Sequence, residues 1–177
     1  MVKEGAVMPN AVTVAIVLAA CRDEGDLVLG KWVEEWSRSA GMEKDSLVGS
    51  ALVGMYEKCG EIVEARRVFD SITNKDVIAW NAMITGYAQN GMSNEAIFLF
   101  HSMREAGVCP DKITLAGVLS ACFAVGALEL GSELDGYASR RGLYSNVYVG
   151  TALVDIGHLE ETWDFIEKIP DKHAGMN

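Results

Sequence analysis

The sequence predicts an all-α protein, an α-solenoid of stacked helix–turn–helix repeats. Two observations predict this fold. The chain matches itself when it is shifted by fixed numbers of residues, and each matching unit carries apolar residues at spacings of three and four, the period of one face of a helix. Half of the 177 residues are hydrophobic, which is enough apolar material for one ordered domain.

The internal repeat is seen at two offsets. A shift of 31 residues places seven residues of one unit on identical residues of the next. In the first of these units they are Ala51, Tyr56, Gly60, Glu64, Ala65, Phe69 and Ser71. A shift of 101 residues gives 11 identities within the 35-residue window 11–45, where chance gives roughly two. Both offsets fit successive units of 35, 31 and 35 residues.

These offsets divide the chain into units. The complete units are 11–45, 46–76, 77–111 and 112–146. Residues 1–10 resemble the tail of a preceding unit, because MVKEGAVMPN echoes MREAGVCPD at 103–111. A fifth, irregular unit covers 147–177.

Each complete unit is expected to form two helices. In unit 77–111 one apolar face is followed by Asn90-Gly91, which ends a helix, then by a second apolar face that ends at Gly107 and Pro110. The first face comprises Trp80, Met83, Ile84 and Tyr87, and the second Ala96, Leu99, Phe100 and Met103. One helical hairpin cannot bury both faces alone, so neighbouring units must stack.

Unit 46–76 repeats this design around Gly60. Its apolar positions are Leu52, Val53 and Tyr56 in the first helix and Ala65, Val68, Phe69 and Ile72 in the second.

The fifth unit departs from this design. Residues 151–155 match 50–54 and residues 156–161 match 59–64, so four residues, about one helical turn, are missing between the two matches. This unit is either a degenerate terminal capping repeat or a sign that the chain is truncated or wrongly joined.

The stretch 77–111, with its Trp80-Asn81 pair and its ending from Gly107 to Asp111, closely resembles the 35-residue pentatricopeptide repeat. The VLAAC of 17–21 and VLSAC of 118–122 resemble its long variant, and 52–72 resembles its 31-residue short variant. This alternation is similar to the plant-specific subclass with ordinary, long and short units. The resemblance implies a right-handed solenoid that binds single-stranded RNA, one base per repeat.

In this family the fifth and last residues of a unit recognise the base edge, and the second packs against the base face. In unit 46–76 these positions hold Ser50, Asp76 and Leu47, a pair that resembles a guanine reader. In unit 77–111 they hold Asn81, Asp111 and Ile78, which resembles a uracil reader. The resemblance therefore implies a preference for a 5′-GU-3′ core, read along a single concave wall.

The other units have weaker candidates for recognition of an RNA base. Ala15 and Ala116 stand at the fifth position of the long units and cannot hydrogen-bond a base, although Asn146 stands at a last position. Thr151 is a candidate in the fifth unit, but its partner would be His173, which matches no reader pair. A second interpretation of Asp76 and Asp111 stays open, because aspartate at these places also suits the N-cap of the following helix.

The net charge of −10 and the pI of about 4.7 oppose RNA binding, since phosphate attraction supplies much of the affinity of nucleic-acid binders. We therefore expect the isolated chain to bind RNA weakly, and to need a longer repeat array or a partner, such as another RNA-processing protein, to bind it well. The alternatives are a helical-repeat scaffold for protein interactions and a degenerate fragment without independent activity. No membrane partner is expected, since the longest apolar run, 11–21, is too short to span a bilayer.

The sequence predicts no enzyme, no cofactor and no metal site. His158-Leu159-Glu160 has the H-x-E form of a zinc deaminase, but no cysteine follows Cys122, so the second metal-binding motif is missing. The four cysteines lack CxxC spacing and are expected to pack as small apolar thiols.

The family resemblance implies an RNA-processing or C-to-U editing specificity factor of the mitochondrion or chloroplast, although no transit peptide is visible.

Aromatic residues of the second helices are assigned to packing rather than to base stacking. Trp32, Trp36 and Trp163 are expected to pack in the core or between repeats. Trp80 takes the aromatic position of the repeat and is expected in the core, and His101 is expected on the surface.

Overall fold

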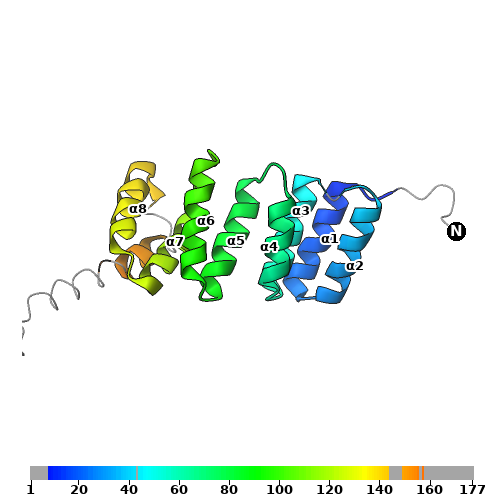
Figure 1. Cartoon of the computed structure of the whole chain (residues 1–177), viewed down its shortest axis with the longest axis horizontal. Coiled ribbons are helices and arrows are strands. Elements are labelled where there is room, and N and C mark those ends of the chain that lie inside the picture. Colours follow the sequence, from blue (N-terminus) through cyan, green and yellow to red (C-terminus); the bar gives the residue numbers. More distant parts are fainter. Residues whose placement is uncertain (1–7, 43, 144–148, 156, 158–177) are drawn as a thin grey trace, which may run out of the picture.

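The computed structural model describes residues 8–42, 44–143, 149–155 and 157. In this described part eight helices follow one another and stack side by side along one axis (Figure 1). They are α1 (Ala11–Glu24), α2 (Leu27–Ser39), α3 (Ser46–Lys58), α4 (Ile62–Ser71), α5 (Val77–Gln89), α6 (Ser93–Glu105), α7 (Lys112–Val125) and α8 (Leu128–Arg141). Residues 149–155 and 157 are also helical. The predicted all-α solenoid is confirmed.

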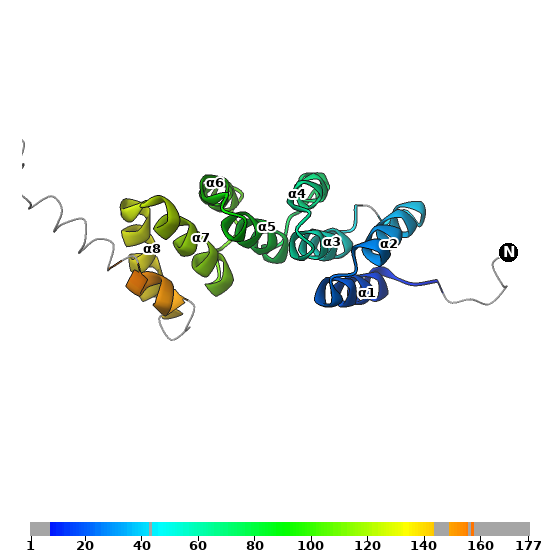
Figure 2. The same cartoon turned by 90° about the horizontal axis from the view of Figure 1, so that it is seen from below.

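The helices form two layers. The first helices of the units, α1, α3, α5 and α7, pack against one another in succession and form what we call the A layer. The second helices, α2, α4, α6 and α8, form the B layer, and each packs against the A helix before it. Figure 2 shows α4 and α6 on the same side of α3 and α5. Each predicted unit from 11 to 146 contains one such pair, while the exact unit boundaries stay a prediction.

Local signals in the sequence place the helix ends. Asp45, Asp76 and Asp111 each precede an A helix and accept hydrogen bonds from its first backbone N–H groups, which otherwise lack partners. Helix α5 ends at Gln89, and Gly91 follows with φ 73°, a left-handed conformation that glycine adopts without strain. The turn predicted at Asn90-Gly91 is confirmed.

The core runs continuously through the stack. All the apolar positions predicted for units 46–76 and 77–111 are buried, including Trp80. Within these units Phe69 meets Trp80 edge to face, with ring centroids 4.9 Å apart. Cys21 and Cys122 are buried as expected, whereas Cys109 is exposed, because it lies in the loop between α6 and α7.

One packing prediction is wrong. Trp32 is 62% exposed, because it lies on a face of α2 that no neighbouring helix covers. Every pair of described helices in close contact includes an A helix, so the outer faces of the B helices stay open. Trp36 is half-buried and packs against the core, as expected, and His101 is exposed. Trp163 lies outside the described residues.

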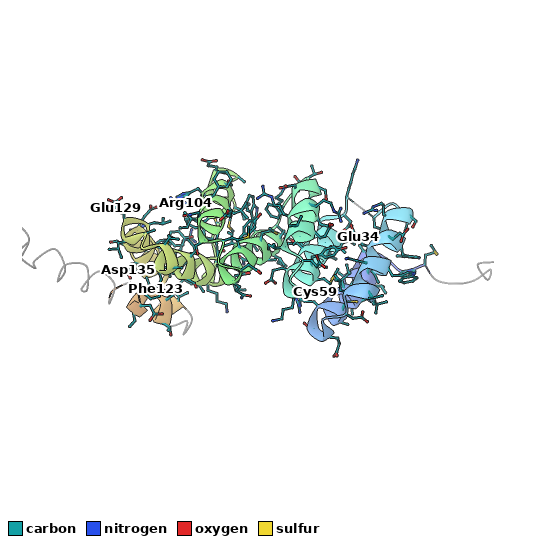
Figure 3. The ribbon with its side chains drawn as sticks, turned by 60° about the horizontal axis from the view of Figure 1, so that its bottom comes forward. Glu34, Cys59, Arg104, Phe123, Glu129 and Asp135 are labelled. Atoms are coloured by element: carbon teal, nitrogen blue, oxygen red, sulfur yellow. The ribbon has the colours of Figure 1, made fainter. Side chains whose placement is uncertain are left out.

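A polar cluster joins the first two repeats. Glu34 of α2, labelled in Figure 3, is only 12% exposed at its side chain, and it accepts a hydrogen bond from the Tyr56 hydroxyl of α3. Its other oxygen pairs with Arg38 at 2.9 Å and with Arg67 of α4 at 2.7 Å. Glu34 therefore ties three helices together.

Ionisation of this cluster is shifted by its surroundings. Burial raises the pKa of Glu34, but the hydrogen bonds from Tyr56 and Arg67 and the charges of Arg67 and Arg38 outweigh it, so the pKa lies below its usual value. Burial, together with the hydrogen bond to Glu34, raises the pKa of Tyr56. Both groups keep their ordinary ionisation states near neutral pH.

None of the helices in the described part of the chain is both long and apolar enough to cross a membrane.

Candidate nucleic-acid interface

A groove crosses the A layer from α1 to the start of α7; we call it the A-face groove. Five of the six predicted base-contacting residues border it. They are Leu47, Ser50, Ile78, Asn81 and Asp111. The groove gathers side chains from four successive predicted units, and the five predicted residues belong to the middle two, 46–76 and 77–111. Equivalent positions of these two neighbouring repeats therefore face one common surface. The sixth residue, Asp76, reaches this set through Ser50.

Ser50 is held at the base of the groove by two acceptors. It is 3% exposed, and its hydroxyl lies 2.8 Å from the Ser46 carbonyl and 2.9 Å from Asp76 Oδ1. A serine hydroxyl has one hydrogen, so it donates to one of the two at a time and keeps its lone pairs. Ser50 and the Asp76 carboxylate thus form a site rich in hydrogen-bond acceptors.

Asn81 takes part in a denser network. Its Nδ2 donates to Asp111 Oδ1 at 3.0 Å, and its Oδ1 accepts from the Thr114 hydroxyl at 2.5 Å. The amide has two N–H donors and two lone pairs on oxygen, so one donor and one lone pair remain. A reversed amide would turn its oxygen toward the Asp111 carboxylate, so the network fixes the orientation of the side chain. Asn81 is 6% exposed, so little of its surface is open to solvent.

The two interpretations of Asp76 and Asp111 are not exclusive. Asp76 Oδ1 accepts from the Ala79 backbone N–H at 2.9 Å and also from Ser50. Asp111 Oδ1 accepts from the Thr114 backbone N–H at 3.0 Å and also from Asn81. Each aspartate therefore caps the following helix and orients the fifth residue of its own unit.

The long unit 11–45 provides an internal contrast. Asp45 caps α3 through the backbone N–H groups of Leu47 and Val48, at 2.9 and 3.2 Å. The fifth residue of this unit is Ala15, which has no polar side-chain atom, so nothing there resembles the Ser50–Asp76 pair. Ala116 leaves the same gap in unit 112–146.

Apolar side chains stand beside the polar pairs. Leu47 and Ile78 are exposed large apolar residues, each at the second position of a predicted unit. Ile113, also exposed, borders the groove at the second position of the following unit. A flat apolar or aromatic group that enters the groove would meet these side chains on its faces and the polar pairs on its edge.

The charge inside the groove is mixed. Arg22 of α1 and Glu57 of α3 both border it. Burial raises the pKa of Glu57, while the positive charges of Lys58 and Arg22 lower it, and burial dominates. With Asp111 also present, the groove offers little net attraction to phosphate groups, in keeping with the net charge of −10.

Sequence reasoning missed several of these residues. Ile113 could have been found, because the repeat alignment places it in register with Leu47 and Ile78. Thr114 carried no such signal, since its bond to Asn81 spans 33 residues and depends on side-chain conformations. Thr151 lies exposed in the helical residues 149–155. Asn146, His158, Glu160 and His173 lie outside the described residues.

Comparison with known proteins identifies the repeats. The family model described as "PPR repeat family" matches residues 75–124, and the one described as "PPR repeat" matches 50–77. In Arabidopsis thaliana, pentatricopeptide repeat-containing protein At2g03380, mitochondrial, is 43% identical over 151 residues, which are 84% of this chain and 22% of that protein. A chloroplastic relative, At5g59200, is 41% identical over 171 residues, which are 93% of this chain and 31% of that protein. The chain thus spans less than a third of these curated relatives.

A solved structure shares the fold. The crystal structure of the pentatricopeptide repeat protein PPR10, which is from maize, in complex with an 18-nt psaJ RNA element superposes with a TM-score of 0.68. The sequence identity is 23%, and the match covers 94% of this chain and 26% of that one.

Proposed function

Because the chain is built from repeats of the pentatricopeptide repeat family, we propose that it binds single-stranded RNA in the A-face groove, one base per repeat. The single observation that carries the proposal is that Ser50 of unit 46–76 borders the same groove as Asn81 and Asp111 of the next unit, 77–111. The RNA element bound to PPR10, a structural relative, supports the same assignment.

The chemistry of the two polar pairs favours a guanine followed by a uracil. Ser50 and Asp76 present acceptors, which suit the N–H groups on the Watson–Crick edge of guanine. Asn81 keeps one donor and one acceptor, which suit the O4 and N3–H groups of uracil. Leu47, Ile78 and Ile113 would pack against the faces of the bases.

The acidic character of the chain sets the expected strength. Few cations line the groove, so phosphate contacts add little, and two base-reading pairs supply most of the selectivity. The isolated chain is therefore a weak and modestly selective binder. The proposal assigns the chain no catalytic step, no cofactor and no metal.

A titration of labelled RNA tests the proposal. We expect a 12-nucleotide RNA with a central GU to bind more tightly than one with AC at the same place, measured by fluorescence anisotropy at low salt. Asn81→Ala should weaken GU binding about tenfold, the scale of one lost base contact. Asn90→Ala is the matched control, because Asn90 is the C-cap residue of α5 and its side-chain amide donates to the Gly86 carbonyl outside the groove.

Two other interpretations predict different results. A protein-interaction scaffold, which the net charge and the alanines at 15 and 116 favour, predicts that wild type and Asn81→Ala bind both RNAs equally. A fragment without independent activity predicts no RNA binding even at low salt. Either result would overturn the proposal, provided that circular dichroism shows all variants folded.

We further propose that the chain is part of an organellar RNA-processing or C-to-U editing specificity factor. The relatives named mitochondrial and chloroplastic support an organellar site but do not choose between the two organelles. Fractionation of plant cells that express the tagged full-length protein tests this. Recovery of the protein only outside both organelles would contradict it.

A further inference from the structure

The B layer contains a cleft between α4 and α6 that the proposed RNA groove does not use. Its wall includes Arg66, Phe69 and Lys75 on one side, Trp80 at the floor and Phe98 on the other side. Its volume is about 460 Å³, within the range of ligand pockets, about 300–1,000 Å³. We call it the B-face cleft.

The cleft is not a gap left by a missing neighbour. The repeats on both sides of it are present, and α4, α5 and α6 all belong to the described part of the chain. Further repeats would extend the stack beyond α1 or α8 and would leave this cleft open. Its occupant therefore has to come from outside the repeat array.

The cleft exposes apolar surface to water. Phe98 is 65% exposed at its rim, and Phe69, Leu99 and Val108 line its interior. A single exposed aromatic residue is ordinary, but Phe98 lines the same cleft as a buried aromatic pair, Phe69 and Trp80. A partner that covers Phe98 would extend an existing core.

One cation in the cleft, Lys75, lacks a carboxylate partner within the described part of the chain. Lys75 is half-buried, and its Nζ lies 5.0 Å from the Phe69 ring centre and donates to the Ile72 carbonyl at 2.8 Å. No ion pair joins Lys75 to a carboxylate of the described residues. Such a cation favours a ligand that brings an acceptor.

The equivalent cleft one repeat earlier is built differently. There Glu34 stands at the position of Phe69, and Arg67 stands at the position of Phe98. Glu34 neutralises Arg67 and Arg38 within the chain itself, at 2.7 and 2.9 Å. The B-face cleft has the aromatic Phe69 in place of that carboxylate, and Lys75 has no ion-pair partner among the described residues.

We propose that the B-face cleft binds a short segment of a protein partner that combines an aromatic or large apolar side chain with a carboxylate a few residues away. The apolar side chain packs on Phe98 and Phe69, and the carboxylate pairs with Lys75. Arg66 is already paired with Asp70 at 2.9 Å, so it borders the site without supplying a free charge. The apolar floor suits a large apolar side chain, which the phosphate backbone of RNA does not offer.

The test uses two fluorescein-labelled ten-residue peptides and fluorescence anisotropy. One peptide alternates Phe and Leu with Asp, and in the other Lys replaces every Asp. We expect the acidic peptide to bind and the basic one to bind at least about tenfold more weakly. Phe98→Ala and Lys75→Glu should each weaken the acidic peptide about tenfold.

Matched variants control for general effects. Trp32→Ala removes an equally exposed aromatic residue at the same repeat position of unit 11–45, and it should change binding less than twofold. Lys31→Glu makes the same charge change on α2, away from the cleft. Urea unfolding midpoints close to that of wild type show that each variant is folded.

Three outcomes would overturn the proposal. One is no binding of the acidic peptide at about 1 mM. Another is equal weakening by Phe98→Ala and Trp32→Ala, which would indicate nonspecific adsorption. The third is loss of GU RNA binding in Phe98→Ala together with displacement of the peptide by RNA, which would make RNA the occupant. Because Asn81→Ala leaves the B-face cleft intact, failure of the RNA proposal leaves this prediction standing.

Discussion

Tyr56→Phe tests how the repeats are held together. The substitution removes the hydroxyl that donates to Glu34 and leaves the ring in the core. A hydrogen bond to a charged group contributes about 1.5–3 kcal/mol. The Arg38 and Arg67 pairs remain, and because both arginines are about half exposed, each contributes only about 0–1 kcal/mol. We therefore expect Tyr56→Phe to lower the free energy of unfolding by about 1.5–3 kcal/mol.

Tyr87→Phe is the matched control, because Tyr87 stands at the same repeat position in the next unit. Its hydroxyl accepts only a long bond from Arg66 Nη1, at 3.4 Å. We expect a loss of about 0.5 kcal/mol or less there, below the range of a normal neutral bond. Urea unfolding followed by circular dichroism at 222 nm measures both variants, with the slope of the transition checked for constancy.

The stability loss caused by Tyr56→Phe should depend on pH, because it depends on the ionisation of Glu34. The pKa of Glu34 is lower in the folded chain, so its stabilising contribution is present above the unfolded pKa, about 4.3, and is lost as the pH falls through the folded pKa. The penalty of Tyr56→Phe should therefore be largest near pH 7 and smaller at pH 3. Equal losses for Tyr56→Phe and Tyr87→Phe, or a penalty that grows in acid, would refute this reasoning.

Two further predictions concern packing and accessibility. In urea unfolding, Gly49→Ala should lower the free energy of unfolding by about 1–3 kcal/mol, because a Cβ there would lie 2.7 Å from Ile72 Cγ1. Gly54→Ala in the same helix is the control: a Cβ there has its nearest neighbour at 3.9 Å, so the substitution should raise the free energy of unfolding by about 0.5–1 kcal/mol. A loss at Gly54 as large as that at Gly49 would contradict this account of the close approach. Burial raises the pKa of the Cys122 thiol to about 11, so in the native chain at pH 8 a disulfide reagent should react with exposed Cys109 and reach Cys122 only after unfolding. Similar native reaction rates for the two thiols, followed by mass spectrometry, would show that the core opens.

The helices and their ends could be predicted because their causes are local. The spacing of Trp80, Met83, Ile84 and Tyr87 defines one face, and Asn90-Gly91 offers the left-handed turn that stops the helix. Such features need only neighbouring residues. The repeat then fixes the stacking, since one hairpin cannot bury both apolar faces.

The failures come from features that depend on distant neighbours. The position of Trp32 in a second helix suggested packing, but the sequence cannot tell that no helix covers that face of α2. The two roles of Asp111 also looked like alternatives in the sequence. In the fold one carboxylate oxygen caps α7 and also orients Asn81, because the loop carries the end of one unit to the start of the next.

The candidate site was predicted through the family resemblance, which assigns roles to positions of the repeat, and through the register that locates those positions in each unit. Register alone brings Ser50 and Asn81 to one groove, and it would also have found Ile113. It could not find Thr114, whose hydroxyl completes the Asn81 network from the next unit. The identity of each base remains a prediction that rests on the remaining donor and acceptor of these side chains.

The most direct measurement is a methyl NMR titration of the chain, labelled at isoleucine δ1, with the GU-containing RNA. Ile78 and Ile113 border the A-face groove, whereas Ile97 lies on α6 in the B layer. The account predicts that the signals of Ile78 and Ile113 shift on addition of RNA while that of Ile97 stays in place. Shifts confined to Ile97, with Ile78 and Ile113 unmoved, would contradict it.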